Sequence, residues 1–151
     1  MGFVKADDTG TPGARGLGMT GIMVSGDWFA RSVLRSASEE STMFSQVIEA
    51  DDGYTALAET WQCVEDGHAP DVVVIDLQSV GASAARLVTE LRAAPETQRT
   101  FVAVIGMPES ESPVTVRHVD FCTSHSVLSS ELADTILEIA MRAVATPQGQ
   151  R

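Results

Sequence analysis

The sequence predicts an α/β domain built on a five-stranded parallel sheet with helices on both faces. Three valines and an isoleucine run from 72 to 75 and are followed by Asp76. A run of β-branched residues without polar interruption is typical of a strand buried on both faces. A second uninterrupted apolar run spans 101–105. Apolar runs of this kind alternate with stretches of helical spacing, which predicts strand–helix–strand units with right-handed crossovers.

The composition limits the class of protein. With 151 residues, 44% hydrophobic and only 5% aromatic, the chain is long enough for one domain with an aliphatic core. The net charge of −11 and the scattered Lys and Arg residues argue against nucleic-acid binding, which needs a clustered basic face. No apolar run approaches the ~18 residues of a membrane span, so a soluble cytoplasmic protein is expected. Cys63 and Cys122 form no CxxC motif and are expected to be buried free thiols.

The predicted boundaries follow from the glycine-rich start and the order of the apolar runs. Residues 1–20 are expected to be a flexible N-terminal tail, 21–145 the domain and 146–151 a C-terminal tail. Strands are expected at 21–25, 46–50, 71–76, 101–105 and 120–123. Helices are expected at 28–40, 54–66, 83–93, 114–119 and 131–145. The fourth of these helices would be very short and would follow a polar loop over 107–113.

Capping residues and apolar spacing predict how the helices begin and which faces they bury. Asp27 is expected to cap the first helix and Ser130 the last. The residues expected on buried faces are Phe29, Val33, Leu34 and Ala37 in the first helix, Leu57, Ala58, Trp61 and Val64 in the second, and Leu87, Val88 and Leu91 in the third.

Asp76 is the leading candidate for a functional side chain. Sites in open α/β sheets collect at the carboxyl ends of the strands, so the strand over 71–76 should deliver this carboxylate to a cleft. A structural role is the alternative, in which the carboxylate accepts hydrogen bonds from loop N–H groups.

The turn over 50–57, Ala-Asp-Asp-Gly-Tyr-Thr-Ala-Leu, resembles the A-x-D/N-G-x-x-A-L turn of the receiver domains of two-component response regulators. The resemblance extends over 21–145 and implies a flavodoxin-like, doubly wound sheet of order 2-1-3-4-5. It places Asp76 at the phosphoacceptor position and Phe121 at the position of the switch aromatic. The stretch between Gly106 and Ser124 is about one helical turn shorter than in a receiver, which implies a shortened fourth helix.

Several positions depart from the receiver pattern. The family's metal-binding acid pair aligns with Ser25 and Gly26, and Asp27 takes the place of a third acid. The remaining departures are Gly106 at the Ser/Thr position, Ser124 or His125 at the Lys position, and Val80 at the proline position. The resemblance therefore implies a pocket of Ser25, Gly26, Asp27, Gln78, Gly106 and Ser124 around Asp76.

These departures weaken each part of a phosphorylation switch. Mg²⁺ is usually bound through one or two carboxylates and keeps several waters, and Asp27 with Asp76 would form a weak metal site. Gly106 has no hydroxyl for a phosphoryl oxygen, and Ser124 brings no positive charge to stabilise the transferring group. No cofactor is expected beyond weakly held Mg²⁺.

The last helix carries more apolar surface than packing on a sheet requires. Its first stripe is Leu132, Ile136, Ile139, Ala140 and Ala143, and a second stripe beside it is Ala133, Leu137, Met141 and Val144. A shortened fourth helix could let this helix sink deeper and bury both stripes. Alternatively, Leu137, Met141 and Val144 form an interaction face, for a homodimer through the helix 4–strand 5–helix 5 face or for another protein.

The sequence predicts a non-enzymatic, receiver-like signalling module that acts through protein–protein interaction. It contains no HExxH or GxSxG motif that would indicate a metalloprotease or a hydrolase, and no GxGxxG opens a helix, so a dinucleotide site has no basis. The expected partner is a histidine kinase, a phosphotransferase, a regulator or a second copy. The alternative is a phospho-responsive single-domain regulator that accepts a phosphoryl group on Asp76 from a histidine kinase or phosphotransferase. A purely structural subunit is the third hypothesis.

Overall fold

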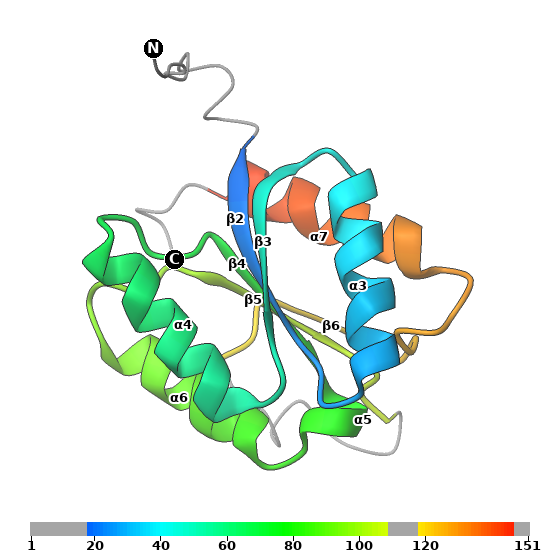
Figure 1. Ribbon diagram of the computed structural model, residues 1–151, viewed down its shortest axis with the longest axis horizontal. Helices are drawn as coiled ribbons and strands as arrows, with labels where there is room; N and C mark the ends of the chain where they lie inside the picture. Colours follow the sequence, from blue (N-terminus) through cyan, green and yellow to red (C-terminus); the bar gives the residue numbers. More distant parts are fainter. Residues whose placement is uncertain (1–17, 109–117, 147–151) are drawn as a thin grey trace.

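The computed structural model describes residues 18–108 and 118–146 and contains one five-stranded parallel sheet (Figure 1). The strands are β2 (Met19–Val24), β3 (Phe44–Ala50), β4 (Val72–Asp76), β5 (Phe101–Ile105) and β6 (Phe121–Thr123). They lie in the order β3-β2-β4-β5-β6, and every neighbouring pair is parallel. In chain order this is 2-1-3-4-5, so the predicted doubly wound topology is confirmed.

The helices cover both faces of the sheet. Their bounds are α3 (Trp28–Glu40), α4 (Gly53–Glu65), α5 (Leu77–Val80), α6 (Ser83–Ala93) and α7 (Leu132–Ala145). Figure 1 shows α3 and α7 on one face and α4 with α6 on the other. The predicted ranges of α3, α6 and β5 agree with the structure residue for residue.

Each central strand contributes alternate side chains to two separate core layers. Val72 and Val74 of β4 pack in the cluster that includes α3 and α7 residues, while Val73 and Ile75 pack in the cluster of α4 and α6. Side chains alternate across a strand, so a strand covered on both sides must be apolar throughout. All five residues of β4 are buried, as the β-branched run predicts.

Two strands begin earlier than predicted. β2 starts at Met19, which is buried, so the domain extends into the stretch expected to be tail. Met19 pairs with Phe44 and Thr20 pairs with Gln46, so both strands begin before the predicted first residues. The pairing register shifts by one residue between these two pairs. The Thr20 amide also donates to the Asp71 carboxylate at 2.9 Å, which fixes the second residue of β2.

Asp27 caps α3 as predicted, with its carboxylate accepting from the amides of Phe29 and Ala30. A similar cap begins α4, where the Thr55 amide donates to Asp52 at 2.7 Å and holds the pKa of that carboxyl below its ordinary value. The predicted Ser130 cap of α7 is wrong. Glu131 is at the N-cap without a side-chain bond, because the preceding turn instead uses the Ser129 hydroxyl, which accepts from the Glu131 amide.

The predicted buried faces of α3 and α4 need correction. Phe29, in the first turn of α3, is 53% exposed. On α4 the buried residues are Gly53, Ala56 and Thr60, whereas Trp61 and Ala58 are exposed. The face of α4 that carries small side chains packs inward, because the Gly53 backbone lies directly against Ser83 at the start of α6.

The two cysteines differ in exposure. Cys63 is partly buried, and burial raises the pKa of its thiol. Cys122 is exposed, contrary to prediction, because β6 is the short edge strand of the sheet. Both are free.

Some predictions fall outside the described residues. These are the tails over 1–17 and 147–151 and most of the expected loop and fourth helix, which fall within 109–117. Among the described helices none is long and apolar enough to traverse a lipid bilayer.

Candidate functional site

Asp76 lies at the carboxyl end of β4 and is only 4% exposed. Two hydroxyl groups donate to the same carboxylate oxygen, Oδ2: that of Ser25 at 2.9 Å and that of Ser79 at 2.8 Å. The two hydroxyl oxygens are 3.2 Å apart. Ser25 follows β2 and Ser79 belongs to α5, so three neighbouring segments meet at this carboxylate. A buried carboxylate is tolerated only when hydrogen bonds replace its lost water, and these hydroxyls do so.

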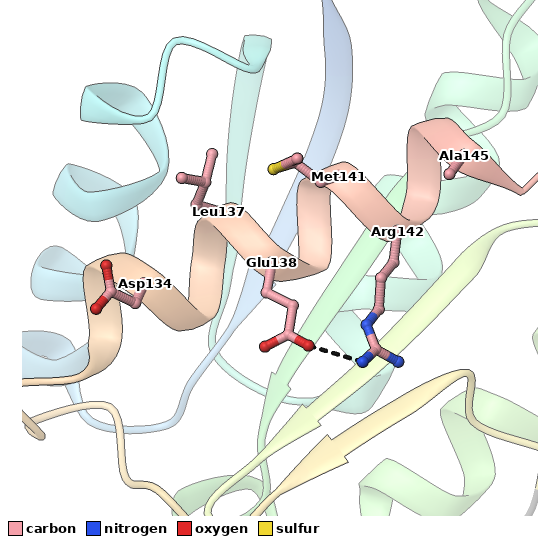
Figure 2. Close-up of a pocket in the computed structure, with 6 residues that line it drawn as sticks. All are labelled: Asp134, Leu137, Glu138, Met141, Arg142 and Ala145. Atoms are coloured by element: carbon pink, nitrogen blue, oxygen red, sulfur yellow. Dashed lines mark ion pairs between the residues drawn. The ribbon is translucent and has the colours of Figure 1, made fainter.

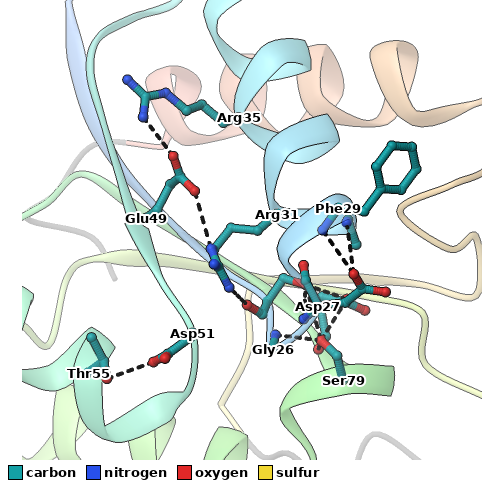
Figure 3. A network of polar contacts seen from close by, with 12 residues as sticks. Gly26, Asp27, Phe29, Arg31, Arg35, Glu49, Asp51, Thr55 and Ser79 are labelled. Atoms are coloured by element: carbon teal, nitrogen blue, oxygen red, sulfur yellow. Dashed lines mark hydrogen bonds and ion pairs between the residues drawn. The ribbon is translucent and has the colours of Figure 1, made fainter.

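The residues after β2 complete this network (Figure 3). The Gly26 amide donates to the Ser79 hydroxyl oxygen at 2.8 Å, and the Asp27 amide approaches the Ser25 oxygen at 3.3 Å. Oδ1 of Asp27 caps α3, where it accepts from the amides of Phe29 and Ala30. The acid nearest in sequence to a metal-binding position is therefore used in helix capping.

A cavity of about 250 Å³ opens beside Asp76. It is lined by Asp27, Ala30, Asp76, Gln78, Ser79, Ser126, Val127 and Leu128. Of the predicted pocket residues, Asp27 and Gln78 line it, while Ser25 and Gly26 take part in the bonds behind it. Ser124 and His125 are exposed and are not among the residues that line this cavity, so the place of Ser124 in a pocket stays a prediction. The loop turns so that the later residues Ser126–Leu128 face the cavity instead.

Gly106 lies close to the site, as predicted, but in a conformation that favours glycine. Its φ is +78°, and a Cβ atom there would be 3.2 Å from Cγ of Gln78 and 3.7 Å from Oδ1 of Asp76. A side chain at this φ is strained by about 1–3 kcal/mol. The backbone therefore disfavours the hydroxyl-bearing residue that receivers carry at this position.

Comparison with known proteins finds matches among solved structures. No protein-family model and no curated protein matches the sequence. Among solved structures, the phosphorylated cyanobacterial phytochrome response regulator RcpA matches with a TM-score of 0.71 and 19% identity, over 86% of this chain and 96% of that one. The chain has the receiver-domain fold. The response regulator domain of Thermotoga maritima CheB matches with a TM-score of 0.65 and 18% identity, over 86% and 98%.

A third match concerns metal binding in a receiver domain. The receiver domain of the sensor histidine kinase PA1611 from Pseudomonas aeruginosa has a magnesium ion coordinated in its active-site cleft. It matches with a TM-score of 0.68 and 11% identity, over 85% of this chain and 99% of that one. In the present receiver fold, residues 18–108 and 118–146 contain no group of three His, Cys, Asp or Glu side chains placed to hold a metal. The nearby acids are Asp76, bonded to two hydroxyls, and Asp27, which caps a helix.

Phe121, predicted at the receiver's switch-aromatic position, lies on β6 and is half-buried against the core. The Arg142 guanidinium of α7 covers its ring, with Cζ 5.2 Å from the ring centroid. A cation over an aromatic face is attracted by the ring's electrons. The contact ties Phe121 to α7 in the present structure.

Three site features were not predicted: the short helix α5, its residue Ser79, and the loop 126–128. A signal for α5 exists, because Gly81 stops the helix with a φ of +68° and Ser79 lies one turn after Asp76. The loop carried no comparable signal, because its approach to the cavity depends on how β6 and α7 are placed.

Proposed function

We propose that this chain is a cytoplasmic, receiver-like signalling module that acts by binding a partner protein and does not depend on phosphorylation of Asp76. The observation that carries the proposal is the hydrogen bonding and surroundings of the Asp76 carboxylate. Its Oδ2 is occupied by the hydroxyls of Ser25 and Ser79, and no Lys, Arg or His side chain is among the described residues that line the adjacent cavity.

The chemistry of phosphoryl transfer supports this proposal. The transferred group develops negative charge that Mg²⁺ and fixed cations must neutralise, and catalysis consists mainly of that electrostatic stabilisation. Here a phosphoryl group on Asp76 would lie near a second acid, Asp27, and beside two hydroxyls that already donate to Oδ2. We therefore propose that the module signals through its surface and catalyses no reaction of its own.

A titration with Mg²⁺ and beryllium fluoride, which mimics a phosphoryl group on a carboxylate, tests the proposal. Trp28 lies next to Asp27 and is 69% exposed, so the Trp61→Phe variant, with Trp28 as its only tryptophan, reports on the site. We expect no saturable change in its fluorescence. The matched control is the same titration with the additional substitution Asp76→Asn, which should give an identical trace.

A phospho-responsive regulator is the second candidate, because Asp76 lines an open cavity with Ser126 also on its wall. It predicts a saturable fluorescence change that disappears in Asp76→Asn, together with a mass increase of one phosphoryl group after incubation with acetyl phosphate and Mg²⁺. Either result would contradict the phosphorylation-independent module.

The surface that we propose for the partner is the outer face of α7. All five residues of its first stripe are buried, but Leu137, Met141 and Val144 are 41%, 57% and 50% exposed, so deeper burial does not account for the second stripe. Figure 2 shows Leu137 and Met141 above a row of Asp134, Glu138 and Arg142. Glu138 and Arg142 are paired at 2.7 Å.

We propose a second copy of the chain as the occupant of this face, because its charges are self-complementary. Asp134 and Arg142 lie two helical turns apart on one side of α7. In an antiparallel pairing of two α7 helices related by a two-fold axis, each Asp134 would approach the other copy's Arg142 while the apolar stripes meet.

Sedimentation equilibrium tests this dimer. We expect the wild-type chain to associate and Met141→Glu to weaken association by at least about tenfold, because a charge replaces an apolar anchor at the centre of the face. Tyr54→Glu on α4, where the ring is 61% exposed, is the control and should leave association unchanged. A wild-type chain that stays monomeric at every concentration would rule out this occupant.

A further inference from the structure

We infer that the cavity beside Asp76 receives a lysine or arginine side chain from a signalling protein other than the second copy that pairs through α7, with its charged end near Asp76 and Asp27 and its alkyl part against Leu128. This inference rests on the proposed function, because it names the chemistry that a partner brings to the site.

The charge of the cavity is the first observation. Two carboxylates line it, and the remaining polar residues of its wall are the neutral Gln78, Ser79 and Ser126. Within the described part of the chain both hydrogen bonds to Asp76 reach Oδ2, and none reaches Oδ1 of this 96%-buried residue (4% exposed). A buried carboxylate oxygen without a donor is unfavourable, and a cationic donor from outside would satisfy it.

The second observation is the apolar surface on the cavity wall and on the exposed residues that follow Asp27 in the chain. Ala30, Val127 and Leu128 line the wall, and Leu128 is 59% exposed. Trp28 and Phe29, which follow Asp27, are 69% and 53% exposed and pack edge to face with ring centroids 6.0 Å apart. Lysine and arginine place their methylene groups along apolar surface while the charged end reaches polar groups. Exposed aromatic residues are also the type that dominates binding energy at protein interfaces.

The size and charge of the cavity favour a lysine or arginine side chain over an anion or a magnesium ion. The volume of about 250 Å³ compares with about 30 Å³ for one water molecule in the liquid, so the four non-hydrogen atoms of a lysine side chain beyond Cβ fit. An anion such as phosphate would meet two carboxylates. A magnesium ion would find one carboxylate capping a helix and the other bonded to two hydroxyls, with apolar carbon on the opposite wall.

The test uses n-butylammonium, which reproduces the end of a lysine side chain, and n-butanol, which has the same chain without the charge. Binding is followed by Trp28 fluorescence in the Trp61→Phe variant and by the NMR shifts of the Ser79 and Leu128 amides. We expect saturable binding of n-butylammonium on the order of millimolar, as befits so few atoms, and no saturable binding of n-butanol.

Two charge-removing variants locate the binding. Asp76→Asn and Asp27→Asn should each weaken n-butylammonium binding by about tenfold, because each removes one carboxylate charge at short range. Both variants keep an oxygen acceptor, and Asn is as good an N-cap as Asp at position 27. Asp66→Asn, at the far end of α4, makes the same change in net charge and should have no effect.

Three outcomes would overturn the inference: equal binding of n-butanol and n-butylammonium, unchanged affinity in both cavity variants, or MgCl₂ that saturates the same NMR shifts at lower concentration. None of these contradicts the proposed function, since a partner could then dock elsewhere. The proposed function fails on a different result, the Asp76-dependent response to beryllium fluoride.

Discussion

Replacing Arg92 by leucine is expected to lower the free energy of unfolding by about 3 kcal/mol, which is among the larger effects of a single substitution. Arg92 ends α6 and its side chain is only 18% exposed. Its guanidinium donates to the carbonyl oxygens of Gln98, Thr100 and His118 and to the Asp120 carboxylate, at 2.7–3.0 Å. The variant would remove one donor from each of three carbonyl groups and from the Asp120 carboxylate.

The position of Arg92 explains why the loss should be global. Asp120 also accepts from the Val102 amide at 2.8 Å, so one carboxylate joins α6, β5 and the start of β6. Urea unfolding followed by circular dichroism measures the effect. Arg86→Leu is the matched control on the same helix. Arg86 is 61% exposed and, among residues 18–108 and 118–146, pairs with Glu90 alone, so its loss should change stability by less than about 0.5 kcal/mol. Equal midpoints for the two variants would show that the Arg92 contacts contribute no stability.

The sheet was predictable because its central strands leave little ambiguity in the sequence. Four β-branched residues at 72–75 and the apolar run 101–105 suit a strand covered on both faces, and the structure buries every one of them. The end of α6 was equally clear, because Pro95 stops a helix that carries Leu87 and Leu91 on one side.

The orientation of α4 was not predictable from hydrophobicity alone. Its aromatic residues favoured a buried Trp61, but the close approach of α6 requires small side chains, and Gly53, Ala56 and Thr60 meet that requirement. Tertiary packing overrode the apolar pattern. Phe29 likewise departs from the apolar pattern, because in the first turn of α3 its ring is mostly exposed.

The position of Asp76 at a strand end was predictable, but its surroundings were only partly so. The bond from Ser25 joins residues 51 positions apart in the chain, and the Ser79 bond depends on a four-residue helix that periodicity cannot detect. The Gly106 conformation, with φ +78° and the Gln78 side chain close by, likewise has no local signal in the sequence. The departures from the receiver pattern could be found by alignment, whereas their structural consequences needed coordinates.

Introducing an acid at position 26, where the receiver pattern has one, should destabilise the protein without creating a metal site. A Cβ atom on Gly26 would lie 2.8 Å from the backbone oxygen of Ser79 and 3.4 Å from that of Asp51. We expect Gly26→Asp to lower the free energy of unfolding by about 2–3 kcal/mol, because the backbone of α5 must move and a further carboxylate joins Asp27 and Asp76. Gly26→Ala isolates the steric part and should account for most of this loss.

Thermal unfolding with and without MgCl₂ distinguishes a steric barrier from a simple loss of ligands. We expect the melting temperature of Gly26→Asp to fall by about 4–12 °C for a chain of this size and to stay low when Mg²⁺ is added. A ligand that binds only the folded state raises its stability, so recovery in Mg²⁺ would reveal a working metal site. That recovery would mean that only the acid was missing, whereas the close approach of Gly26 to the Ser79 carbonyl indicates that a side chain has no room there while Ser79 holds Asp76.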